Sequence, residues 1–105
     1  MGDGDGPLMS HTITEIGHGS FELRLAGELD LATADELRVS LEETVAAVTD
    51  KLVVDISELS FADTSGIALW VSWSQRVPRI EIRNAPPMIL RAIQAMGLTK
   101  RLNPS

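Results

Sequence analysis

The sequence predicts an α/β domain in which a four-stranded mixed β-sheet is backed by about three helices, in the order β-β-α-β-α-β-α. Three observations support this class. Two short alternating segments separated by glycines come first, a continuous apolar segment of strand length occupies residues 52–56, and segments with helical spacing of apolar residues surround it. At 105 residues the chain has the size of a single domain, without room for a second hydrophobic core.

The first two strands are expected at residues 11–16 and 21–26, joined by the glycine-containing loop 17–20. In the second of them apolar residues alternate with charged ones, which is typical of a half-buried strand in a β-hairpin. A helix of about four turns should follow, because Thr33 and Glu36 have capping-box spacing. Apolar residues then recur at helical spacing at Leu37, Leu41, Val45 and Val48.

The second half of the chain alternates strands and helices. The apolar segment 52–56 is expected to be a central strand covered on both faces. A strongly apolar helix at residues 67–75 and a border strand at 79–83 should follow, and Pro86 and Pro87 should open a third helix that ends at Gly97. These strand-helix-strand units predict parallel pairing with right-handed crossovers.

Composition limits the kinds of partner. The chain has 9 Lys plus Arg against 15 Asp plus Glu, a net charge of -6, which disfavours nucleic acid and anionic lipid. It has no apolar stretch near the ~18 to 20 residues that cross a bilayer and no secretory signal pattern, so we expect a cytoplasmic protein without direct membrane contact. Residues 1–10, rich in Gly and Asp, are expected to be a flexible leader, and residues 11–105 a single domain.

The residue inventory argues against an enzyme. His11 and His18 are the only histidines, and no Gly-rich phosphate loop or Rossmann fingerprint is present. There is no cysteine for a thiol nucleophile or a thiolate zinc site. A carboxylate cluster for a metal is conceivable, but acidic residues are common at the loops of parallel sheets; the candidates are Glu28, Asp30, Asp55 and Asp63. We therefore predict no catalytic residue, no cofactor and no metal.

The turn Asp63-Thr64-Ser65-Gly66, which opens the second helix, is the candidate functional site. Free backbone N–H groups and the positive end of the helix dipole favour an anionic group such as phosphate there. Gly66 removes side-chain bulk, so that a partner's active site could approach the Ser65 hydroxyl. The alternative is that Asp63 or Thr64 simply caps the helix. The residues of the turn alone do not decide between these two interpretations.

This turn, together with Gly-Glu-Leu-Asp-Leu-Ala-Thr-Ala at residues 27–34, resembles the STAS family of bacterial anti-sigma factor antagonists. The similarity runs from about Thr12 to Leu102. It implies that Ser65 is phosphorylated by an anti-sigma factor that is itself an ATP-dependent serine kinase. The unphosphorylated form would bind this kinase and free a sigma factor, and the phosphorylated form would dissociate until a phosphatase resets it.

The resemblance also assigns the surroundings of the phosphoacceptor. Asp30, Asp63, Thr64 and Gly66 would shape its pocket, with Thr64 as the rival acceptor. In the second helix Trp70 is expected in the core, whereas Trp73 falls off the main apolar stripe and is a candidate partner contact.

Two departures from the family pattern favour an alternative function. Only residues 76–78 separate the second helix from the following strand, and the chain ends at Ser105 without the last helix of many relatives. Trimmed STAS domains also serve as constitutive interaction subunits of lipid-transport, transporter or stressosome complexes without phosphorylation.

Overall fold

The computed structural model describes residues 9–105 and confirms the expected order of strands and helices. The elements are β1 (Met9–Gly17), β2 (Ser20–Leu29), α1 (Leu31–Ser40), α2 (Glu42–Ala47), β3 (Lys51–Ala62), α3 (Thr64–Ser74), β4 (Ile80–Arg83), α4 (Pro87–Ala95) and α5 (Thr99–Leu102). Residues 9 and 10 of the expected leader belong to β1. The expectation of a flexible leader otherwise concerns residues 1–8, which lie outside the described part. Within that part no helix combines the length and apolarity needed to cross a membrane.

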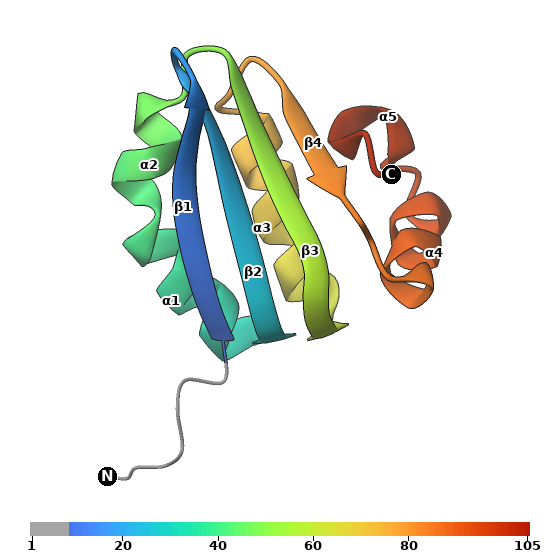
Figure 1. The fold of residues 1–105 in the computed structure, drawn as a ribbon. Coiled ribbons are helices and arrows are strands. Elements are labelled where there is room, and N and C mark those ends of the chain that lie inside the picture. Colours follow the sequence, from blue (N-terminus) through green and yellow to red (C-terminus); the bar gives the residue numbers. More distant parts are fainter. Residues whose placement is uncertain (1–8) are drawn as a thin grey trace, which may run out of the picture.

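The sheet has the strand order β1-β2-β3-β4. β1 and β2 form the expected antiparallel hairpin, whereas β2 with β3 and β3 with β4 pair in parallel. Figure 1 shows α1, α2 and α3 on one face of this sheet, with α4 and α5 beside β4. Because β2 and β3 are parallel, their carboxyl ends lie at the same end of the sheet, and α1 and α3 begin there.

The apolar segment at residues 52–56 lies in an interior strand, as predicted, but the helices cover only one of its faces. Leu52, Val54 and Ile56 belong to the hydrophobic core, each with 0% exposure. Val53 points to the opposite face and is also buried, between Glu22 of β2 and Glu81 of β4 at the paired positions. On this second face, long polar side chains of the neighbouring strands, rather than helices, therefore flank Val53.

The first helix begins earlier than predicted and is divided in two. β2 continues to Leu29, so the chain turns at Asp30, whose carboxylate accepts a hydrogen bond from the Thr33 backbone N–H at 3.0 Å. The Thr33 hydroxyl in turn accepts one from the Asp30 N–H at 2.9 Å. The capping box is therefore Asp30 with Thr33, and the predicted cap at Thr33 is wrong. Leu41 interrupts the helix between α1 and α2 yet stays buried, as the helical spacing predicted.

The predicted exposure of Trp73 is wrong. Its side chain is 1% exposed, and that of Trp70 is 0% exposed. α3 contacts α1, β3 and α5, so more than one of its faces is covered. The apolar residues outside the main stripe of α3 are accounted for by this packing, and Trp73 is a core residue that cannot touch a partner in this structure.

The C-terminal segment differs from the expectation by one additional helix. α4 opens at the two prolines and ends where Gly97 adopts φ 72°, and the Leu98 N–H closes the cap on Ile93 O at 3.0 Å. The short α5 follows and buries Leu102 completely. The sequence did not indicate it, because four residues are too few for a helical period to be visible.

Replacing Trp73 tests its place in the core. We expect Trp73→Ala to lower the free energy of unfolding by about 3–5 kcal/mol, because it leaves a large cavity, and Trp73→Phe to lower it less. Urea denaturation followed by circular dichroism measures both. Met88→Ala is the control, since Met88 is 77% exposed, and it should change stability by no more than about 0.5 kcal/mol. A loss for Trp73→Ala as small as the control's would contradict the burial.

Candidate functional site

The candidate site lies at the edge of the sheet where β2 and β3 end together. Leu29 and Ala62, the last residues of the two strands, are partners in the parallel register. The next residue in each case is an aspartate that caps a helix, Asp30 for α1 and Asp63 for α3. The Asp63 N–H also donates to Leu29 O at 3.1 Å. This backbone bond fixes the start of α3 against the end of β2.

The carboxylate of Asp63 occupies the mouth of α3. Its Oδ1 accepts hydrogen bonds from the Ser65 N–H at 2.9 Å and the Gly66 N–H at 3.3 Å. Of the two interpretations left open by the sequence, the cap is therefore present. These two N–H groups are not available to a phosphate, so the expectation that free donors collect at this helix mouth is wrong for them.

Gly66 serves the internal packing of the chain. It is buried, and a Cβ at this position would lie 2.6 Å from Cδ2 of Leu29, which is itself 0% exposed. The missing side chain lets the first turn of α3 approach the end of β2 closely. We expected this glycine to give a partner's active site access to Ser65. In the structure it instead makes room for the side chain of Leu29.

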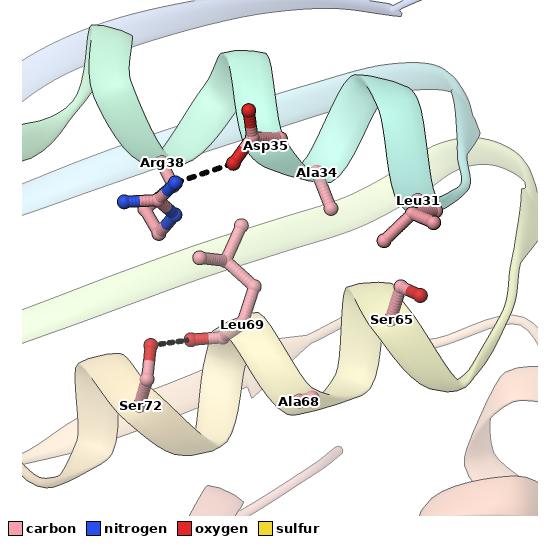
Figure 2. A pocket seen from close by; sticks show the side chains of 8 residues that line it. All are labelled: Leu31, Ala34, Asp35, Arg38, Ser65, Ala68, Leu69 and Ser72. Carbon is pink, nitrogen blue, oxygen red and sulfur yellow. Dashed lines mark hydrogen bonds and ion pairs between the residues drawn. The ribbon is translucent and has the colours of Figure 1, made fainter.

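Ser65 lies in an open groove between α1 and α3 (Figure 2). The groove has a volume of about 350 Å³. Ser65 and Leu31 stand at one end and Arg38 at the other, where it is ion-paired with Asp35. The remaining lining residues are Ala34, Ala68, Leu69 and Ser72. The lining is mostly apolar, and Leu31 is 72% exposed although it lies next to this groove.

The hydroxyl of Ser65 is available for chemistry. Among residues 9–105 no group hydrogen-bonds to it, whereas Ser72 and Ser74 of the same helix donate to backbone carbonyls at 2.7 and 2.6 Å. Thr64 also has no hydroxyl partner within this range and is exposed, so it stays the rival acceptor. Ser65 differs from Thr64 in lining the groove.

The acidic residues considered as metal ligands lie at different places in the structure. Hydrogen bonds from the Thr33 backbone N–H and hydroxyl hold the pKa of Asp30 below its usual value, so that this cap is ionised at neutral pH. Asp55 lies apart from this edge, within β3. Burial opposes its ionisation, but hydrogen bonds from Ser57 and Asn84 outweigh that effect and lower its pKa. In the described part of the chain no three potential ligands converge on one point.

The structure brings Asp30, Asp63, Thr64, Ser65 and Gly66 to one end of the sheet and leaves Trp73 in the core. Of these residues only Ser65 lines the groove. Sequence reasoning missed Leu31, Leu69 and Arg38. Leu31 carried a usable signal, because it is an apolar residue that directly follows a cap and falls outside the buried stripe of its helix.

Comparison with known proteins places this geometry in a family. A family model described as "Mlab, STAS domain" matches residues 14–104. RsfB, an anti-sigma-F factor antagonist of Mycobacterium tuberculosis, is 30% identical over 95 residues, which cover 87% of this chain and 78% of RsfB.

Solved structures show the same fold. The anti-sigma factor antagonist SpoIIAA in its unphosphorylated form matches with a TM-score of 0.77 and 20% identity, over 91% of this chain and 88% of that one. A chain of the Acinetobacter MlaFEDB complex in an ATP-bound conformation matches with a TM-score of 0.67 and 26% identity, over 80% of this chain and 93% of that one.

The fold and the groove define a small α/β domain that presents an unbonded hydroxyl at the mouth of a helix, beside an open apolar surface. With the matching family model across most of its length, the chain belongs to the STAS domain family. The resemblance on which the sequence analysis relied is thereby confirmed.

The contact between Gly66 and Leu29 can be tested by a double-mutant cycle. We expect Gly66→Ala to lower the free energy of unfolding by about 1–3 kcal/mol, because the new methyl group overlaps Leu29. In the Leu29→Ala background the same change should cost less, since the space is then vacant. Gly17→Ala is the control, because a Cβ there meets Ser20 at an ordinary 3.7 Å. Full additivity of the two changes in denaturant unfolding would contradict the contact.

The capping box at Asp30 predicts a pH-dependent contribution to stability. Because the folded-state pKa of Asp30 is lowered, its contribution is present above the unfolded value near 3.8 and is lost as the pH falls through the folded pKa. Thr33→Val removes the hydroxyl but keeps the backbone donor, so the pKa of Asp30 should rise toward its usual value. An NMR titration of the Asp30 carboxyl carbon measures this change. An unchanged pKa would show that the hydroxyl contributes nothing to the shift.

Proposed function

We propose that this chain is an anti-sigma factor antagonist whose unphosphorylated form binds an anti-sigma factor and thereby releases a sigma factor. Phosphorylation of Ser65 would switch this binding off. The observation that carries the proposal is the unbonded Ser65 hydroxyl in an open, largely apolar groove. The similarity to RsfB and SpoIIAA, which are anti-sigma factor antagonists, supports the same assignment.

The surroundings of Ser65 explain how a phosphate would act as an off switch. Phosphorylation adds a charge of about -1.5 to -2 at neutral pH. It would lie beside the Asp63 carboxylate, which already holds the Ser65 and Gly66 N–H groups. The nearest groove cation, Arg38, is at the far end and is paired with Asp35. The added charge would therefore stay strongly hydrated and repel acidic neighbours.

A hydrated phosphate opposes docking on the groove. Partner binding would have to remove water from the phosphate without offering it a buried counter-charge, and such desolvation is costly. In the unphosphorylated state the exposed side chain of Leu31 at the rim of the groove offers apolar surface that gains from being covered. The switch proposed here thus changes the solvation of one groove and requires no rearrangement of the fold.

In this scheme the chain is a ligand and a substrate, not a catalyst. The anti-sigma factor, as a serine kinase, would transfer the γ-phosphoryl group of ATP to Ser65 Oγ, releasing ADP and the hydroxyl proton. A phosphatase would return the chain to its binding form by hydrolysis. The cytoplasm supplies ATP and the sigma factor, and it is the compartment in which we place the protein.

A second candidate is a constitutive STAS subunit of a transport complex that needs no phosphorylation. It is favoured by the description of the matching family model and by the similarity to a chain of the MlaFEDB complex. In that case the groove between α1 and α3 would be covered permanently by a neighbouring subunit.

A kinase assay tests the leading proposal. Purified full-length chain incubated with ATP and a co-encoded anti-sigma factor should gain one phosphate in its intact mass. Thr64→Ala should keep this gain and Ser65→Ala should lose it, because only Ser65 lies within the groove. Peptide sequencing by mass spectrometry locates the phosphate.

The outcome also separates the two candidates. Phosphate that persists in Ser65→Ala would refute Ser65 as the acceptor, and absence of any gain with every co-encoded kinase would favour the constitutive subunit. Calorimetric titration with the anti-sigma factor gives a second readout: Ser65→Asp should weaken binding by on the order of tenfold or more, by introducing charge at a desolvated contact.

A further inference from the structure

The two outer strands of the sheet, β1 and β4, differ in how their outer edges are covered. At β4 the C-terminal residues cover the outer edge: the Asn103 side chain donates to Ile80 O at 3.0 Å, and the Ser105 N–H donates to Ile82 O at 2.9 Å. At β1 no described residue pairs with the outer edge, since β2 is the only neighbouring strand within residues 9–105. In the part of the chain that the structure describes, one edge strand is therefore covered and the other is open.

The open edge has few of the usual features that prevent edge-to-edge pairing. β1 is nine residues long and contains neither lysine nor proline, and its irregularity in register lies near the turn, between Glu15 and Gly17. Every residue from Ser10 to Gly17 is exposed, although alternate ones point to the face that carries the helices. Ile13 is 42% exposed and Ile16 is 46% exposed. The side chains of this strand are thus left largely uncovered, although α1 lines a small hollow together with Met9 and His11.

The sequence of β1 is complementary to itself in one antiparallel register. With a two-fold axis at Ile13, the two copies of Ile13 lie opposite each other and Thr12 of one copy lies opposite Thr14 of the other. His11 then lies opposite Glu15. Apolar and Thr–Thr pairs are among the cross-strand pairs that stabilise antiparallel sheets. An imidazole always carries an N–H that can donate a hydrogen bond to a carboxylate, so His11 and Glu15 also match. Moving the axis to Thr12 or Thr14 places Ile13 opposite His11 or Glu15 and loses this match.

We propose that β1 is a self-association surface, at which two copies of this chain join their sheets through antiparallel β1–β1 pairing centred on Ile13. The occupant of the open edge is thus a second copy. Paired residues in this register point to the same face, so the helices of both copies lie on one side of a continuous sheet of eight strands.

This pairing leaves the proposed phosphoacceptor groove accessible. α1 faces β1 with Thr33, Glu36 and Leu37, which line a small hollow together with Met9 and His11. It faces the groove with a different set of residues, Leu31, Ala34, Asp35 and Arg38. The two surfaces lie on different sides of the same helix, and the dimer presents two grooves. The inference therefore stands independently of whether Ser65 is phosphorylated.

Sedimentation equilibrium of the full chain, from micromolar to millimolar concentration, tests the association. We expect reversible dimers that strengthen with added salt, because each copy carries a net charge of -6 and salt screens their repulsion. Ile13→Lys places two like charges opposite each other and should weaken the dimer by on the order of tenfold or more. Met88→Lys adds the same charge at an exposed apolar position of α4 and should leave the dimer unchanged.

Single cysteines test the register, because the natural chain contains none. Ile13→Cys should form a symmetric disulfide on mild oxidation, since directly opposite Cα atoms lie about 4.5–5.5 Å apart. Thr14→Cys should not, because its counterpart lies two residues along the partner strand, beyond the about 7 Å limit for a disulfide. Circular dichroism confirms that each variant is folded. A chain that stays monomeric at millimolar concentration, a dimer that Ile13→Lys leaves intact, or equal cross-linking of both cysteine variants would each overturn the proposal.

Discussion

The close approach of Gly66 to Leu29 is the contact on which the geometry of the candidate site depends. It joins the first turn of α3 to the last residue of β2, and the Asp63 N–H bond to Leu29 O reinforces it. Because α1 begins two residues after Leu29, the same contact sets the spacing between α1 and α3 and hence the width of the groove at Ser65. A side chain at position 66 would push α3 away from β2 and would thereby change the groove between α1 and α3, without touching the Ser65 hydroxyl directly.

The two aspartates of the site act first as structural groups. Asp30 and Asp63 each accept backbone hydrogen bonds at a helix start. Their carboxylates therefore stabilise the two helix N-termini. This arrangement explains why an acidic residue precedes each helix at the carboxyl ends of two parallel strands. It also makes the surroundings of Ser65 electrostatically unfavourable to a further anion, which is the property that a switch-off residue requires.

Much of the fold was predictable because its elements carry strong local signals. Three such signals are visible in the sequence. They are the glycine-containing turn between β1 and β2, the apolar segment of β3, and the prolines and the glycine that flank α4. The failures have a common cause: they depend on contacts between segments far apart in sequence. The burial of Trp73 follows from the packing of α1 and α5 around α3, and the role of Gly66 follows from Leu29, a residue of another strand. The cap at Asp30 was missed because β2 extends to Leu29, well beyond its alternating part.

The parallel pairing of Leu29 with Ala62 also has a consequence for how the molecule folds. These residues are distant along the chain, and the connection between them must close before either helix start can be positioned. Contacts of such long sequence separation form late and slow the folding of small domains. The groove at Ser65 consequently exists only in molecules that have completed their folding. An incompletely folded chain can therefore expose the serine motif to solvent, but it lacks the groove surface that the proposed partner would recognise.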